Sequence, residues 1–337
     1  MSLPDWARAH ASVPLDGRAP LFAATIRDKP EDFDVTEELD FEFSGDGEHD
    51  YLFVEKTNTN TEWLARQLAK FADVAAKDVG YSGLKDRHAV TRQWFSVPRW
   101  NQPDWSTFEL GDVRILDQQR NLRKLRRGAH RRNRFRIVLR GAKKGSDTFQ
   151  ERLHLIKEEG VPNYFGEQRF GRDGGNIALA NSWAAGKRLP RHKRSIAIST
   201  VRSFLFNEAL DRRVRDDTWN RILPGDIASL DGTGSIFDVE AVDETLTKRC
   251  DEMDIHPTGI LWGDGADVDA VPAGHDDWLN ALSNARVKAA NRSLRLRVND
   301  LRWSVDNGSL LLEFSLGRGA FATSVLREIA NVTHRFA

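Results

Sequence analysis

The stretch RFRIVL, Arg134–Leu139, alternates basic and apolar residues before it becomes continuously apolar. This pattern is typical of a strand with one buried face. Five similar short runs are FDVTEEL (33–39), YLFVEK (51–56), QWFSV (93–97), DVRIL (112–116) and LLLEFSL (310–316). Turn-rich segments separate these runs, and only one clear helix interrupts them in the first half of the chain. The sequence therefore predicts a mixed, mostly antiparallel sheet.

That helix is predicted directly after NTNT, residues 58–61. Thr59, Asn60 or Thr61 can cap its first turn, and Glu62 suits the positive end of the helix dipole. An apolar stripe then follows at helical spacing, formed by Leu64, Leu68, Phe71 and Val74. We expect this helix to pack on the sheet and to place the segment that begins at Gly83 on a loop or at a strand end.

The middle of the chain changes character between about Gly160 and Val298. Helices are predicted over NIALANSWAAGK (176–187) and RSFLFNEALDRRV (202–214), with glycine- and aspartate-rich loops between elements. Strand signals return from Leu301, and LGRGAFATSVLREIANV (316–332) reads as a turn that opens onto a helix. We therefore predict an α+β protein with one discontinuous domain, residues 1–158 plus 304–337, interrupted by an inserted α+β domain, residues 159–303.

Composition limits the classes of protein to which the chain can belong. A chain of 337 residues with 40% hydrophobic residues is long enough for about two folded domains. Its single cysteine, Cys250, excludes an internal disulfide and a thiolate zinc cage within one chain. The first residues, MSLPDWARAH, lack the apolar core of a signal peptide, and no apolar run approaches the roughly 18 residues of a membrane span. We expect a cytoplasmic monomer without a membrane partner.

Positive charge is segregated although the chain has 50 basic and 50 acidic residues. No acidic residue occurs from Gln118 to Ser146, and further basic clusters are KRLPRHKR (187–194) and NRSLRLR (291–297). The basic residues of the first cluster are Arg120, Arg123, Lys124, Arg126, Arg127, Arg131, Arg132, Arg134, Arg136, Arg140, Lys143 and Lys144. Such clusters are either solvated faces or surfaces that attract phosphate backbones. Three of them, with aromatic residues nearby, favour a nucleic-acid partner and steep salt dependence of binding.

One carboxylate stands out in the segment GLKDRHAVTRQ, Gly83–Gln93. Asp86 lies between Lys85 and Arg87, but in an extended segment adjacent side chains point to opposite faces. We therefore expect the cation beside Asp86 to come from Arg27 or Lys29, or from the arginines at 131–134. Thr91 and Gln93 are expected to supply hydrogen bonds. An ionised aspartate can act as nucleophile, base or electrostatic stabiliser, whereas the simpler interpretation is a surface turn residue.

Several other kinds of site lack support in the sequence. The nine histidines form no HExxH or similar ligand spacing, and no glycine-rich phosphate-binding loop is present. The acidic stretch with Asp264, Asp267 and Asp269 lacks the residue order of a calcium loop. Cys250 lies among acidic residues, which disfavours a reactive thiolate. We therefore expect neither a metal nor a cofactor.

GLKDRHAVTRQWF (83–95) resembles the signature segment of the TruD family of tRNA pseudouridine synthases. Four further segments resemble family motifs in the family's order: KPEDFDVTE (29–37), RRGAHRRNRF (126–135), VPNYFGEQRFG (161–171) and GRGAFATSVLRE (317–328). Together they span nearly the whole chain. The resemblance implies a cofactor-free isomerase, an intramolecular transferase that converts uridine 13 in the D arm of tRNA to pseudouridine.

The resemblance also implies roles for individual residues. Asp86 falls on the catalytic aspartate of the family, and Phe33, Asn133 and Phe321 fall on positions that hold the substrate nucleotide. We add Lys85 and Phe135 to the predicted substrate-binding residues. Residues predicted to contact the RNA backbone are Arg123, Lys124, Arg126, Arg127, Arg131 and Arg132. Stacking on aromatic rings can offset the cost of flipping the uracil out, at about 1–3 kcal/mol per base.

Two alternatives to this activity remain at the level of sequence. A nucleoside-directed glycosidase also breaks a C1′ bond, but it ordinarily uses two facing carboxylates, and the motifs offer one. An RNA-binding protein with an inactive site is the second alternative, against which the intact Lys85-Asp86 pair argues. Whether Asp86 attacks C1′, attacks C6 or removes a sugar proton is open from sequence.

Overall fold

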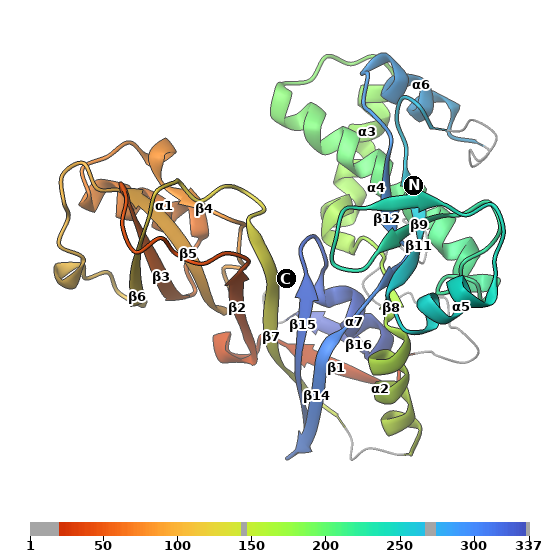
Figure 1. Cartoon of the computed structure of the whole chain (residues 1–337), viewed down its shortest axis with the longest axis horizontal. Coiled ribbons are helices and arrows are strands. Elements are labelled where there is room, and N and C mark those ends of the chain that lie inside the picture. The colour runs from red at the N-terminus through yellow and green to blue at the C-terminus, as the bar shows by residue number, and fades with distance from the viewer. Residues whose placement is uncertain (1–19, 143–146, 267–273, 335–337) are drawn as a thin grey trace. The chain divides into compact units, whose positions relative to one another are not determined.

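The computed structural model describes residues 20–142, 147–266 and 274–334. Its chain forms two compact units (Figure 1). Among the described residues, the sheet unit comprises residues 24–142, 299–319 and 333–334, and the helical unit comprises residues 20–23, 147–266, 274–298 and 320–332.

The strands are β1 (Phe22–Ile26), β2 (Phe33–Leu39), β3 (His49–Thr57), β4 (Gly80–Tyr81), β5 (Val90–Pro98), β6 (Val113–Asn121), β7 (His130–Arg140), β8 (Val161–Pro162), β9 (Ile227–Leu230), β10 (Ile236–Asp238), β11 (Ile255–Leu261), β12 (Ala290–Ser293), β13 (Arg295–Leu296), β14 (Asn299–Asp306), β15 (Ser309–Gly317) and β16 (Ala330–His334). The α-helices are α1 (Thr61–Phe71), α2 (Asp147–Glu159), α3 (Gly175–Ala184), α4 (Arg191–Arg215), α5 (Glu244–Asp251), α6 (Asp276–Asn284) and α7 (Ala322–Ile329).

The main path of the large sheet runs β14-β15-β7-β2-β5-β3-β6 (Figure 1). Every pairing along this path is antiparallel except that of β2 with β5, which is parallel. The six predicted strand runs lie in β2, β3, β5, β6, β7 and β15, and the mixed, mostly antiparallel α+β fold is confirmed.

Helix α1 packs on this sheet as predicted. The Asn60 side chain accepts hydrogen bonds from the backbone nitrogens of Glu62, at 2.9 Å, and Trp63, at 3.1 Å, which selects Asn60 among the possible caps. Leu64 and Leu68 are fully buried in a core with residues of β3 and β5. The predicted stripe is longer than the helix, which ends at Phe71, before Val74.

The helical unit has its own core around α3 and α4 and a sheet of order β10-β9-β11-β12. Both predicted helices of the middle segment are confirmed, and α4 begins earlier than predicted, within the KRLPRHKR cluster. The C-terminal helix α7 packs in this unit, where Ser324 Oγ donates to the carbonyl of Tyr164 at 2.9 Å. A second bond in this unit runs from Arg152 to the carbonyl of Glu328 at 2.7 Å.

The compact units divide the chain at other positions than the predicted domains. Residues 147–158 and α7 cluster with the middle segment, whereas Asn299–Trp303 of β14 clusters with the sheet. The units describe packing alone. The assignment of residues 159–303 to an inserted functional domain therefore stays a prediction. Along the described ranges, every helix is too short or too polar to cross a membrane.

Candidate active site

The loop between β4 and β5 carries Asp86, and polar groups from neighbouring elements hold its backbone. The carbonyl of Gly83 accepts from Gln93 Nε2 at 3.1 Å, and Lys85 N donates to Thr61 Oγ1 at 3.1 Å. The Asp86 carbonyl itself accepts from Lys56 Nζ at 3.1 Å. Bonds from β5, α1 and β3 thus fix successive parts of one short loop. The location of Asp86 on a loop beyond α1 is confirmed.

Asp86 makes an ion pair with Arg27, which lies just after β1. Arg27 donates from Nη2 to Asp86 Oδ2 at 2.8 Å. The Arg27 side chain is 13% exposed and that of Asp86 is 44% exposed, so the carboxylate keeps a solvent-facing side. The prediction of a cation outside the GLKDRHAVTRQ segment is confirmed for Arg27.

Two further features define the position of Arg27: a contact with an aromatic ring and an unusual backbone conformation. Its guanidinium lies over the ring of the buried Phe33, 4.1 Å from the ring centroid. The backbone of Arg27 has φ of 59°, a left-handed conformation that a residue with a Cβ rarely adopts. Strain of this kind costs on the order of 1 kcal/mol and is found preferentially at functional sites. The guanidinium therefore has a defined position between Phe33 and Asp86.

Lys85 is occupied by a different carboxylate. Its Nζ donates to Glu37 Oε2 at 2.5 Å, and both side chains are buried. Burial raises the pKa of Glu37 above its ordinary value, although Lys85 opposes this shift. Lys85 therefore links the Asp86 loop to β2. Only 6% of the Lys85 side chain is exposed. Its contact with substrate stays a prediction.

The other predicted residues of the sheet unit share one face of β2 and β7. Phe33, Val35 and Glu37 alternate along β2, and Glu37 is paired in register with Asn133 of β7. Two residues along β7, Phe135 packs edge-on against Phe33 with ring centroids 6.3 Å apart. Phe135 and Phe33 are both buried in this structure. The structure therefore connects Asp86, Lys85, Phe33, Asn133 and Phe135 through Arg27 and Glu37.

Three buried polar atoms at this site have no hydrogen-bond partner within the described chain: Arg27 Nε, Thr91 Oγ1 and Asn133 Oδ1. The prediction that Thr91 supplies a hydrogen bond is wrong, because its hydroxyl is buried on the inner side of β5 without a partner. Buried polar groups are almost always satisfied, so a group of unsatisfied atoms favours a polar ligand. The Asn133 amide oxygen could accept from an N–H donor such as that of uracil.

Two titratable residues, the buried Lys56 and the half-buried His130, border the loop and were missed in the sequence. Lys56 is 0% exposed, and its Nζ also donates to the Thr59 carbonyl at 2.6 Å. His130 lies next to Ser82, whose Oγ is 2.6 Å from His130 Nδ1. Burial, with Lys85 and Arg318 nearby, lowers the pKa of His130 to about 4. His130 is therefore neutral near pH 7.

The alternation of residues along β3 indicates that Lys56 is buried. Leu52, Val54 and Lys56 alternate along β3 and are all fully buried, so the lysine occupies an inward-facing position. Glu37 follows Phe33 and Val35 on β2 in the same way. A charged residue at the end of an apolar alternation is thus the pattern that marks both buried charges.

Lys56 gives a prediction about pH. Burial lowers the pKa of Lys56 from 10.5 to about 8, with Lys85 adding to the shift and Asp86 opposing it. Between these two pH values the unfolded chain binds a proton that the folded chain has lost, so unfolding becomes less favourable as pH rises. Relative to Lys56→Met, the wild-type free energy of unfolding should rise by up to about 3 kcal/mol from pH 8 to 10.5. Urea unfolding measures this difference, with the exposed Lys70→Met as control. Parallel pH curves for wild type and Lys56→Met would contradict the assignment.

The first basic cluster divides into two parts. Arg123, Lys124, Arg126 and Arg127 are exposed on the β6–β7 connection. Lys124 Nζ donates to the Lys77 carbonyl at 2.5 Å, and the Arg127 guanidinium covers Tyr81, 3.7 Å from its centroid. These four residues make no ion pair within the described ranges. They form the basic connection, which remains suited to phosphate contacts.

The strand β7 part of this cluster is largely paired with carboxylates. Arg132 donates to Glu38 at 2.5 Å and to Asp300 at 3.3 Å, and Arg134 also bonds to Glu38, at 2.9 Å. Arg131 lies 4.0 Å from Asp40 and is well exposed. The acid-free stretch of sequence is therefore partly neutralised by acids from neighbouring strands. Backbone contacts by Arg131 and Arg132 stay predictions, and Lys143 and Lys144 lie outside the described residues.

The third basic cluster is not a positive surface, which corrects the prediction. Arg295 is buried and donates to His256, at 3.0 Å, and to the carbonyl of Cys250, at 2.6 Å. Arg297 pairs with Asp231 at 2.9 Å. These arginines satisfy carbonyl and carboxylate groups inside the helical unit. Burial also raises the pKa of Cys250, in keeping with an unreactive thiol.

Phe321 belongs to the helical unit, where it precedes the first residue of α7. Its side chain is 37% exposed, and its ring centroid lies 6.4 Å from that of Phe165. Its predicted role in holding the nucleotide stays a prediction. The described residues contain no cluster of three or more histidine, cysteine or carboxylate side chains that could hold a metal ion. Asp267 and Asp269 of the rejected calcium loop lie outside the described residues.

Comparison with known proteins matches nearly the whole chain, in two consecutive segments, to one family. The family model described as tRNA pseudouridine synthase D (TruD) matches residues 18–178 and 176–329. A tRNA pseudouridine synthase D from Nitrosococcus oceani is 46% identical over 329 residues, covering 93% of this chain and 92% of that protein. Its counterpart from Pseudomonas fluorescens is 44% identical, with coverages of 93% and 92%.

A solved structure matches the fold. The crystal structure of a Methanosarcina mazei protein that carries the TruD name has a TM-score of 0.72, with 20% identity, and the match covers 99% of each chain. At that identity the structural match concerns the fold alone, whereas the sequence matches extend through the Asp86 loop and the β7 motif. The chain therefore belongs to the tRNA pseudouridine synthase D family.

Proposed function

We propose that this protein isomerises uridine 13 in the D arm of tRNA to pseudouridine and that Asp86 is its catalytic residue. Family membership supports the reaction class. The observation that carries the assignment of Asp86 is its 2.8 Å pair with Arg27 on a loop that Lys56, Thr61 and Gln93 hold in place. A fixed, partly exposed carboxylate beside one cation is suited to reaction with a bound nucleotide.

The reaction breaks the N1–C1′ bond, rotates the uracil in the site, forms the C5–C1′ bond and releases the C5 proton. Asp86 would act on C1′, on C6 or on a sugar proton, and each route requires an ionised carboxylate. Arg27 donates directly to Oδ2 and so fixes the orientation of this carboxylate. The orphan Oδ1 of Asn133 offers an acceptor for the N3–H of uracil.

The contacts of Phe33 and Phe135 bear on which aromatic ring stacks on the uracil. Arg27 covers the ring of Phe33, and Phe135 stacks on Phe314 with ring centroids 5.3 Å apart. For uracil to stack on Phe33, the guanidinium would have to share or leave that face. We therefore propose that Phe33 first positions Arg27, and that stacking of the base involves Phe33, Phe135 or Phe321. The basic connection would bind the RNA backbone.

The test of this function uses one tRNA transcript and a variant that differs from it only by cytidine at position 13. Wild-type protein should form one pseudouridine per transcript, at position 13, and none in the variant. Pseudouridine at another position would sink the site assignment. Release of free uracil would indicate a glycosidase, for which Glu37, buried against Lys85, is a poor second carboxylate.

A further inference from the structure

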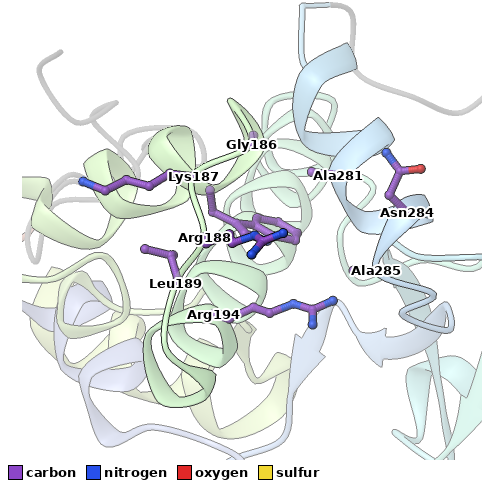
Figure 2. Close-up of a pocket in the computed structure, with 10 residues that line it drawn as sticks. Gly186, Lys187, Arg188, Leu189, Arg194, Ala281, Asn284 and Ala285 are labelled. Atoms are coloured by element: carbon purple, nitrogen blue, oxygen red, sulfur yellow. The ribbon is translucent and has the colours of Figure 1, made fainter.

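The turn between α3 and α4 forms, with α6, a pocket of about 430 Å³ (Figure 2). Its basic lining residues are Lys187, Arg188 and Arg194, and Trp183 and Leu189 contribute apolar surface. The volume lies within the range of about 300–1,000 Å³ that is typical of ligand sites. We call this feature the α3–α4 pocket. It shares no residue with the Asp86 site.

The basic residues around the α3–α4 pocket are free to bind an anion. Lys187, Arg188 and Arg194 are exposed, and none of them makes an ion pair with another described residue. No acidic residue occurs in the sequence between Asp173 and Glu208. This cluster thus differs from the arginines of β7, which neighbouring carboxylates neutralise.

The position of the cluster is unfavourable for the helix itself. Helix α4 begins at Arg191, has no acidic residue in its first turn and has no side-chain cap. Basic residues at this end of a helix are repelled by the helix dipole and by one another. Residues that oppose local stability in this way are typical of functional surfaces. A bound anion would remove both repulsions.

The shape and chemistry of the pocket favour a nucleotide over a simple ion. Figure 2 shows the side chains of Arg188 and Arg194 extending toward α6, whereas Lys187 extends away from it. Arginine forks bind phosphate oxygens in pairs, and a half-buried tryptophan offers a surface for a base or a ribose. Such contacts recognise the backbone without reading its sequence.

We propose that the α3–α4 pocket is a second RNA-binding site, which binds one phosphate and the adjoining nucleotide of the substrate RNA. Arg188 and Arg194 bind the phosphate, and Trp183 with Leu189 contacts the adjoining nucleotide. The inference rests on the proposed function in that the RNA is a tRNA. The pocket would contribute to affinity and leave the chemical step unchanged.

The test compares two double variants that remove equal charge from the helical unit. Arg188→Ala/Arg194→Ala changes the α3–α4 pocket, and Arg212→Ala/Arg221→Ala removes two exposed arginines that do not line it. The pocket variant should bind tRNA about tenfold more weakly, and its slope of log affinity against log salt should fall by one to two. The control should stay within about twofold of wild type. Thermal unfolding establishes that both variants are folded.

The saturating single-turnover rate of the pocket variant should equal that of wild type. If both double variants have the same tRNA affinity and salt slope, the α3–α4 pocket is not an RNA site. A lower saturating rate would also overturn the proposal, because the pocket would then affect the chemical step. Affinity is measured directly, so a wild type that binds tRNA without forming pseudouridine refutes the proposed function and leaves the test of the pocket intact.

Discussion

Asp86→Asn should lower the single-turnover rate of pseudouridine formation by at least about 10³-fold. Asparagine preserves the shape of the side chain and can still accept the hydrogen bond that Arg27 donates at 2.8 Å. It carries no charge, so it can act neither as a nucleophile nor as a base. The affinity for tRNA and the midpoint of thermal unfolding should change little, since Asp86 is partly exposed and lies outside the core.

The matched control is Asp46→Asn, which removes the same charge from an exposed position between β2 and β3. Its rate should remain within about twofold of wild type, as is usual for substitutions of exposed residues. Should Asp86→Asn retain a comparable rate, the carboxylate would have no part in the chemistry. Loss of folding in Asp86→Asn would show up as a lowered unfolding midpoint and is therefore separable from loss of catalysis.

Arg27→Ala should reduce turnover by about 10²-fold, because the variant loses a charge-assisted hydrogen bond at the reacting group. Arg27 acts through Asp86 and is a positioning residue, so rate alone does not define its role. Arg27→Lys should recover part of the rate, with the charge restored and the planar contact to Phe33 lost.

Lys29→Ala provides the comparison for Arg27→Ala, because Lys29 is a nearby exposed cation that makes no ion pair with Asp86. We expect its rate to match that of wild type. Unchanged turnover in an Arg27→Ala/Lys29→Ala double variant would eliminate Arg27 as the partner on which catalysis depends. A rate that Arg27→Lys does not recover at all would instead show that catalysis does not depend on the positive charge at this position.

Local patterns were sufficient to predict six strands of the large sheet. Alternation in β2, β3 and β7 distinguishes the inner face from the outer face, and the cap at Asn60 places the start of α1. The mostly antiparallel arrangement follows from short turn-rich connections. The parallel pairing of β2 with β5 was not predicted, because it depends on how the chain between them folds back over the sheet.

The site was predictable in its residues and less so in its contacts. Adjacent side chains on an extended segment diverge, which indicated that Lys85 and Arg87 need not be the ion partners of Asp86. The choice of Arg27 required the structure, since residues 59 positions apart meet there. Long-range pairing likewise explains why the acid-free stretch overstated the positive surface. Glu38 and Asp300, far apart in sequence, neutralise Arg132.

The most direct test of the central claim is release of tritium from the C5 position of uridine-labelled tRNA, measured side by side for wild type and Asp86→Asn. Formation of the C5–C1′ bond expels that hydrogen, so wild type should release tritium in proportion to the pseudouridine formed. Asp86→Asn should release almost none over the same time. Equal release by the two proteins would contradict the catalytic role of Asp86.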